Sequence, residues 1–171
     1  MCIRDRWAKE LYGFVDHVPE TEEYGVVSYV YRARQPFVPE KIYAALNGDL
    51  PWVIRAKGHF WIATRPEWVA EFSLAGSLSS VKPMGTWWAS VPKERWPDHN
   101  GVSEYVQSHW QDPWGDRRQE LVFIGAGIDW AALKAKLDAC LLPDLIATGI
   151  QDLPLNLPDP FPGWRKVEDA A

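Results

Sequence analysis

Hydrophobic and polar residues alternate along the stretch WVIRAKGHFWIAT, residues 52–64. Alternate side chains of a β-strand face opposite ways, so the pattern predicts a strand with two different faces. The face expected to pack in the core consists of Ile54, Ala56, Gly58, Phe60 and Ile62. The opposite face consists of Arg55, Lys57, His59 and Trp61. The first face is apolar, and the second raises the question of what it contacts.

Similar patterns predict further strands elsewhere in the chain. They are GVVSYVYRA, WVAEFSLAG, SSVKPMGTWWASV and RRQELVFIGAG, which occupy residues 25–33, 68–76, 79–91 and 117–127. Short connections join several of them. Parallel neighbours need crossovers of about a dozen residues or more, so this spacing favours antiparallel pairing.

Three segments have helical signals. In VPEKIYAALNG, residues 38–48, Pro39 suits the first helical position and Gly48 the position just past the end. In IDWAALKAKLDACLLPD, residues 128–144, Asp129 suits the N-cap. An apolar stripe along that helix consists of Leu133, Leu137, Cys140 and Leu141. A shorter helix is expected around residues 103–110.

Together these elements predict an α+β fold, a mainly antiparallel sheet of four to six strands with helices packed on one side in two layers. We expect one domain over residues 24–142. Residues 1–23 have the composition of a linker remnant, and the opening MCIRDR is interpreted as an artefactual start, so that the natural protein would begin upstream. Residues 143–171 are expected to form a proline-rich C-terminal tail.

Composition excludes several classes of protein. The net charge of −5 and the pI near 5.4 argue against nucleic-acid binding, which usually needs a basic face. No apolar run approaches the roughly 18 residues of a membrane span, and the first residues lack a hydrophobic signal core. The two cysteines predict neither a disulfide framework nor a CxxC metal site. We therefore expect a cytoplasmic protein without membrane or nucleic-acid partners.

The sequence offers little sign of a reactive centre. The GAG at residues 125–127 lacks the lysine and the Ser or Thr of a P-loop. The histidines are scattered, at His17, His59, His99 and His109, without the close spacing of zinc ligands. Cys140 lies on an apolar stripe and is expected to be a buried thiol. We predict no catalytic and no metal-binding residues, although acids and histidines do gather in the loop at residues 92–115.

The row Arg55, Lys57, His59 and Trp61 has two interpretations. Antiparallel sheets commonly have one solvated face, which would explain the polar residues. Arg and Trp are also enriched at the centres of protein interfaces, which would make the row a docking surface. The row alone leaves both interpretations open.

Several motifs in order resemble the C-terminal domain of CobW-type metallochaperone GTPases. They are ETEEYGVVSYVYRARQPFVPEKI, VIRAKGHFWIAT, WW and GDRRQELVFIGAGID, within residues 20–142. The resemblance implies a partner domain, N-terminal in the family, that binds GTP through a P-loop and carries a cysteine-rich metal motif. GTP, Mg²⁺ and Zn²⁺ are thus expected only with that domain, and no cofactor in this chain. The family often has His where this chain has Val38, which weakens a metal role here.

The resemblance favours a non-catalytic, regulatory protein-interaction domain of a GTP-binding zinc or cobalt chaperone. The expected interaction face is Arg55, Lys57, His59 and Trp61, together with Arg117 of the DRR stretch. Its partner would be the GTPase domain or a metal-recipient protein. One alternative is a small module that holds Zn²⁺ through His and acidic side chains, and another is an independent enzyme that uses the loop at residues 92–115.

Overall fold

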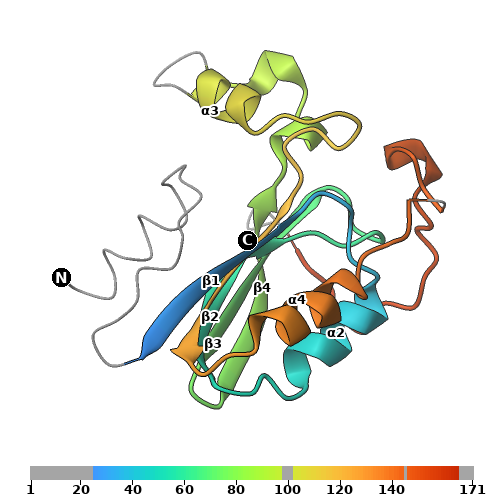
Figure 1. Ribbon diagram of the computed structural model, residues 1–171. Coiled ribbons are helices and arrows are strands. Elements are labelled where there is room, and N and C mark those ends of the chain that lie inside the picture. The colour runs from blue at the N-terminus through green and yellow to red at the C-terminus, as the bar shows by residue number, and fades with distance from the viewer. Residues whose placement is uncertain (1–24, 98–101, 145, 166–171) are drawn as a thin grey trace.

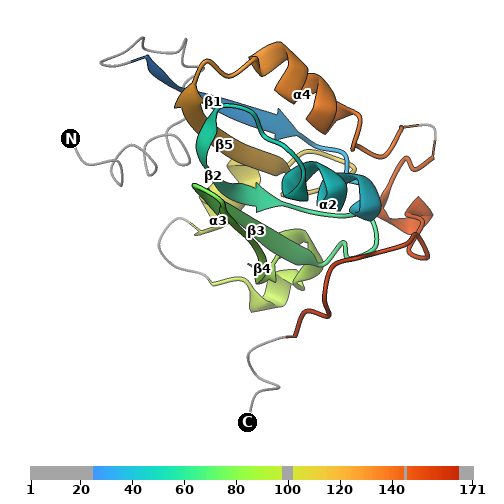
Figure 2. The same cartoon turned by 90° about the horizontal axis from the view of Figure 1, so that it is seen from below.

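The computed structural model describes residues 25–97, 102–144 and 146–165. A five-stranded antiparallel sheet forms its centre (Figures 1 and 2). In spatial order, the strands are β1 (Val26–Ala33), β5 (Gln119–Ala126), β2 (Val53–Phe60), β3 (Trp68–Ala75) and β4 (Leu78–Thr86). The predicted α+β class and antiparallel pairing are confirmed.

Two helices cover one face of the sheet, α2 (Pro39–Asn47) and α4 (Trp130–Asp138) (Figure 1). Their starts follow the predicted signals. Pro39 opens α2 without a side-chain cap from Val38, and the Asp129 side chain accepts a hydrogen bond from the Ala132 N–H at 3.0 Å. A third helix, α3 (Val102–Ser108), lies beyond one end of the sheet with the 3₁₀ turns η1 (Trp88–Ser90) and η2 (Lys93–Arg95) (Figure 1).

The main hydrophobic core lies between the sheet and the two helices. Tyr31 of β1 and Phe123 of β5 are buried there, and the Tyr31 hydroxyl donates to Asp138 of α4 at 2.9 Å. The ring of Tyr29 stacks on Trp130 with centroids 4.9 Å apart. The predicted apolar stripe packs in the core: Leu133, Leu137 and Cys140 are buried, and Leu141 packs against them. The helix is shorter than predicted, because α4 ends at Asp138 and Cys140 and Leu141 follow it.

A second hydrophobic cluster extends the core beyond the end of the sheet. It consists of Trp61, Ala63, Val69, Trp87, Trp114, Leu142, Ala147 and Leu153. The last two of these residues come from the expected tail, which also carries the 3₁₀ turn η3 (Ile150–Asp152). Phe161, from the same proline-rich stretch, is buried in the main core. The chain after residue 142 therefore contributes to the packing of both clusters.

The predicted strand at residues 52–64 needs two corrections. Strand β2 ends at Phe60, and Ile62 instead forms a parallel bridge with Phe37. Ile54 was expected in the core, yet it is 50% exposed. Val53 pairs with Gly125 and Arg55 with the adjacent Ile124, so Ile54 is an extra residue in β2, a bulge that turns its side chain outward.

Within the described residues, no helix has the length and apolar character needed to cross a bilayer.

Candidate functional site

The sheet has a second face, opposite α2 and α4, which no helix of the described residues covers and which we call the open face. Its exposure varies, since Arg55 is exposed and Val122 is buried. Ala56 and Phe60 of β2 pack in the main core, so the alternating residues Arg55, Lys57 and His59 point to the open face. In the same order, the residues of β5 that pair with them are Ile124, Val122 and Glu120. On the other side of β2, Lys57 pairs with Ser73 and His59 with Glu71. Charged side chains of several strands therefore meet on this face.

The predicted interaction row is only partly on this face. Arg55 is exposed, and Lys57 forms an ion pair with Glu71 at 3.6 Å with both side chains partly exposed. The His59 side chain is only 16% exposed. The prediction is wrong for Trp61 and Arg117, which are 0% and 5% exposed.

Trp61 is buried because it follows the end of β2 and enters the second cluster. The Gln119 side chain accepts a hydrogen bond from the Trp61 N–H at 2.9 Å and donates to its carbonyl at 3.0 Å. The indole Nε1 donates to the Arg34 carbonyl at 3.1 Å. With its backbone and indole polar groups bonded inside the domain, Trp61 has no free surface for a partner.

Arg117 is equally committed to internal contacts. Its guanidinium donates to the Pro66 carbonyl at 2.6 Å, to the Trp114 carbonyl at 3.1 Å and to the Ser90 hydroxyl at 2.6 Å. Burial lowers the pKa of Arg117, although nearby Asp116 opposes this. Arg117 therefore joins the β5 start to η1 and to the β2–β3 connection.

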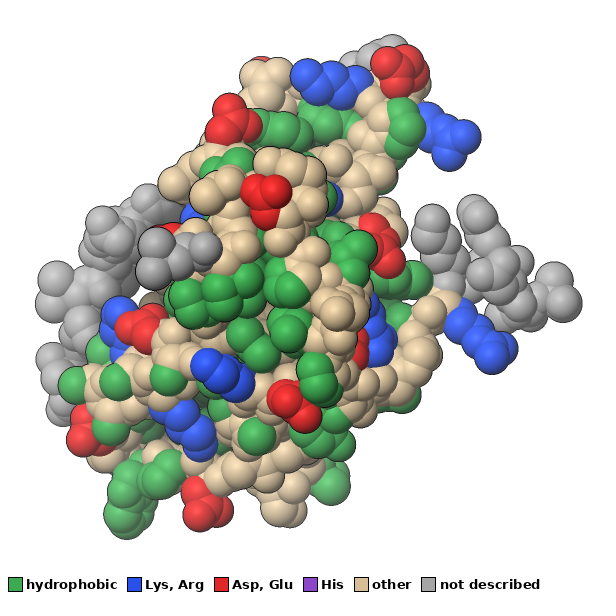
Figure 3. All heavy atoms as spheres, turned by 90° about the vertical axis from the view of Figure 1, so that its right-hand side faces the viewer, with side chains coloured by type: hydrophobic (Ala, Val, Ile, Leu, Met, Phe, Trp, Pro, Cys, Tyr) green, Lys and Arg blue, Asp and Glu red, His purple; other side chains and the backbone are tan. Residues whose placement is uncertain are grey.

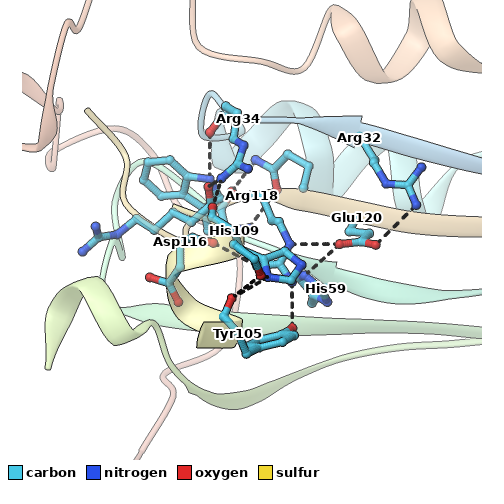
Figure 4. A network of polar contacts seen from close by, with 12 residues as sticks. Arg32, Arg34, His59, Tyr105, His109, Asp116, Arg118 and Glu120 are labelled. Atoms are coloured by element: carbon cyan, nitrogen blue, oxygen red, sulfur yellow. Dashed lines mark hydrogen bonds and ion pairs between the residues drawn. The ribbon is translucent and has the colours of Figure 1, made fainter. Parts of the chain in front are cut away.

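The open face contains a polar group that sequence reasoning missed, which we call the Glu120 cluster: Arg32, His59, Arg118 and Glu120 (Figure 4). The Glu120 side chain is 7% exposed. Its carboxylate accepts a hydrogen bond from Arg118 Nε at 2.9 Å and lies 3.6 Å from Arg32 Nη2 and 3.8 Å from His59 Nε2. A buried carboxylate is costly unless it is paired, and here two arginines from β1 and the β5 start provide the pairing.

Arg118 connects the Glu120 cluster to the α3 region. Its Nη2 donates to the Tyr105 hydroxyl at 3.0 Å, and its Nη1 donates to the Asp116 carbonyl at 3.1 Å (Figure 4). The Asp116 carboxylate in turn accepts from the backbone N–H groups of Trp88 and Ala89 at 3.1 and 2.8 Å. The stretch DRRQE, residues 116–120, thus ties the sheet to the lobe that contains η1 and α3.

His59 is held neutral in this setting. Burial, with a smaller contribution from the positive charge of Arg118, lowers its pKa to about 4 against the opposing effect of Glu120. Its Nε2 atom is buried without a hydrogen-bond partner among the described residues. The contact with Glu120 is therefore not an ion pair near neutral pH, and His59 contributes a buried, neutral ring beside Trp87.

The other chemistry considered from the sequence finds little support in the described residues. No group of three or more His, Cys, Asp or Glu that could hold a metal ion occurs in the described part of the chain. His109 contacts the Tyr105 carbonyl through Nδ1 at 2.8 Å, while His17 and His99 lie outside the described residues. Cys140 is buried as predicted, its Sγ lies 3.2 Å from the Lys136 carbonyl, and burial raises its pKa. A thiol held in its protonated form is a poor nucleophile.

The structure thus defines an antiparallel α+β domain with one covered and one charged sheet face. Residues 26–141 match the family described as "Cobalamin synthesis protein cobW C-terminal domain", and the chain belongs to this family. "Zinc-regulated GTPase metalloprotein activator 1" of Dictyostelium discoideum is 38% identical over 142 residues, which are 81% of this chain and 29% of that protein.

Two further similarities were found. "Zinc chaperone Rv0106" of Mycobacterium tuberculosis is 29% identical over 136 residues, 79% of this chain and 34% of that protein. The Zn(II)-bound YjiA GTPase of E. coli is 16% identical with a TM-score of 0.48, covering 69% of this chain and 30% of that one. The chain therefore spans about a third of the length of the curated relatives it matches.

Proposed function

We propose that this domain is a non-catalytic, regulatory protein-interaction domain of a GTP-binding metal chaperone, and that its open face contacts the GTP-binding part. The observation that carries the proposal is the asymmetry of the sheet. Helices α2 and α4 cover one face, whereas the other presents Arg55 and Lys57 beside the partly exposed Glu71. The names of the two curated relatives, a zinc-regulated GTPase and a zinc chaperone, support the class of whole protein.

The Glu120 cluster lies on the same face and gives it a fixed set of polar contacts. Arg118 joins Glu120 to the α3 region, so the β2–β5 surface and the lobe beyond the sheet are fixed to each other. A rigid surface loses little side-chain entropy when it binds, which favours affinity. The exposed charges farther along β2 would set orientation and partner choice. For such a contact to transmit the nucleotide state, it must differ between the GTP and GDP states.

The test uses the full-length Dictyostelium relative with alanine at the positions that align with Arg55 and Lys57. Hydrogen exchange of the region aligned with β2 is compared between GDP and a non-hydrolysable GTP analogue. We expect a nucleotide-dependent difference in the unaltered protein and its loss in the double variant. Alanine at the position aligned with Lys134, which is exposed on α4 and therefore on the covered side, serves as the control.

The proposal fails if exchange at β2 is the same with both nucleotides, or if the double variant keeps the full difference. If the control variant keeps the nucleotide-dependent difference in exchange and the double variant loses it, the coupling is assigned to the open face.

A further inference from the structure

The strongest feature outside the open face is the seating of residues 159–164, DPFPGW, which we call the C-terminal segment. It has no regular secondary structure. It contacts five residues that we together call the tail surface: Tyr43, Phe60, Thr64, Arg65 and Trp68. In Figure 2, the red end of the chain runs back from η3 toward the sheet beside α2. Hydrophobic side chains gather near the middle of the side of the molecule that carries α2 in Figure 1 (Figure 3).

Arg65 holds the segment through every nitrogen of its guanidinium. Nε donates to the Asp159 carboxylate at 2.8 Å, Nη1 to the Pro162 carbonyl at 2.7 Å and Nη2 to the Phe161 carbonyl at 2.8 Å. The Thr64 hydroxyl donates to the same carboxylate at 2.7 Å. Such charge-assisted bonds in a fixed fork recognise one arrangement of acceptors and reject others.

Two aromatic side chains complete the recognition. Phe161 is 6% exposed, and its ring centroid lies 5.2 Å from Tyr43 and 6.2 Å from Phe60. The ring of Trp164 lies 4.3 Å from the Arg65 guanidinium carbon and 6.2 Å from Trp68. The segment therefore presents an acidic anchor, a buried aromatic anchor and a cation–π contact within six residues.

The C-terminal segment is attached to the domain in the manner of a bound peptide, through side chains and not through backbone pairing. Within the described chain, no backbone–backbone hydrogen bond joins residues 159–165 to the rest of the domain. The segment also lies outside residues 26–141, the part that matches the family. Trp164 Nε1 is buried and has no hydrogen-bond partner in the part of the chain that the structure describes. Proline-rich segments lose little backbone entropy on binding and commonly dock on aromatic surfaces.

We propose that the tail surface is a peptide-binding site, and that the C-terminal segment occupies it as an internal ligand. The peptides it accepts are proline-rich, with an acidic residue followed within five positions by two aromatic residues. A partner protein that carries such a segment competes with the tethered one, whose effective concentration is on the order of millimolar. The site is therefore available to a partner only when the internal segment is released.

The experiment uses the full chain with a protease recognition sequence inserted between Leu157 and Pro158. After cleavage, a fluorescently labelled peptide of residues 158–165 is added, and its binding is followed by anisotropy. We expect the peptide to replace the cut segment and to bind the uncut chain at least about tenfold more weakly. In the peptide, Asp159→Asn and Phe161→Ala should each weaken binding about tenfold or more.

Matched controls separate specific recognition of the peptide from nonspecific binding. Gly163→Ala in the peptide should leave affinity unchanged, because an added Cβ there meets no atom within 4 Å. Arg65→Ala in the chain should abolish uptake of the peptide, while circular dichroism shows that the sheet remains folded. The proposal is overturned if the cut chain unfolds when the segment leaves, or if the cut chain remains folded and never takes up the peptide. It is also overturned if the Gly163→Ala and Asp159→Asn peptides bind equally well.

Discussion

Glu120 depends on its neighbours more than any other charged residue of the open face. Its carboxylate is almost fully covered, and Arg118, which pairs with it, is itself buried. The Coulomb attraction and hydrogen bond between them offset the cost of removing both charges from water only while both are present. Removal of one partner leaves the other charge buried and unpaired.

We therefore expect Glu120→Ala to lower the free energy of unfolding by about 3 kcal/mol or more, measured by urea denaturation. Glu71→Ala is the matched control. Glu71 pairs with Lys57 on the same face with both side chains partly exposed, so its loss should cost less than about 1 kcal/mol. Equal and small effects of the two substitutions would show that Glu120 is better solvated than its burial indicates.

The lowered pKa of His59 predicts that the folded domain loses stability in mild acid. Its folded-state pKa of about 4 lies below the ordinary value of 6.5 because of burial and Arg118, with a further contribution from His109 and opposition from Glu120. The unfolded state therefore binds the proton first as the pH falls from about 6.5 to 4. Stability is full above this window and declines through it, by about 2 kcal/mol between pH 7 and pH 5.

The measurement compares urea denaturation at pH 7 and pH 5 for the unaltered chain and for His59→Gln. The variant lacks the titrating ring, so its stability should fall less between the two pH values, by the same 2 kcal/mol. Identical pH dependence in the two proteins would assign the acid sensitivity to other groups.

Local sequence signals and tertiary contacts account for different residues of the site. Alternation correctly assigns Arg55 and Lys57 to the face opposite the core, because strand geometry alone decides it. The burial of Trp61 depends on Gln119, which lies 58 positions away in the sequence. No pattern within residues 52–64 contains that information. The run DRRQE directly before the apolar LVFIG was a visible signal for a buried charge network, but it also has the composition of a solvated surface.

Helices and strands were predictable where their ends are chemically marked. Pro39 and Asp129 fix the starts of α2 and α4 through local backbone geometry and capping. The bulge at Ile54 and the end of β2 at Phe60 depend on pairing with β5 and on the bridge to Phe37. These features arise from partners that single-sequence periodicity does not identify.

The pairing of β2 with β5 requires a glycine at position 58. A Cβ on Gly58 would collide with the Glu120 carbonyl and lie 2.8 Å from the Leu121 Cα, both of which are backbone atoms. Gly58→Ala should therefore cost about 3 kcal/mol or more, since the two strands must separate. Gly85→Ala is a close control, because Gly85 has the same φ of +155° and an added Cβ there meets no atom within 4 Å. If both variants lose equal stability in urea, the requirement for glycine at position 58 comes from its backbone conformation and not from the contact between the strands.

Across the whole chain, the family assignment and the site geometry give different kinds of information. Residues 26–141 establish the family, and the order of motifs in the sequence was sufficient to indicate it. The geometry then changes the proposed interaction face: Trp61 and Arg117 are internal, while the Glu120 cluster lies on the same sheet face as Arg55 and Lys57. The functional proposal therefore rests on a smaller surface than the sequence alone predicted.

The same geometry predicts the response of the chain to zinc, which separates an interaction domain from a metal-holding module. Structural zinc sites use four converging ligands and contribute about 10 kcal/mol or more of binding free energy. In residues 25–97, 102–144 and 146–165, no three His, Cys, Asp or Glu side chains are placed to share an ion. We expect titration against a competing chelator to show only weak binding, without a stoichiometric equivalent. One tight equivalent per chain would favour the module, and loss of that equivalent in single His→Ala variants would identify the ligands.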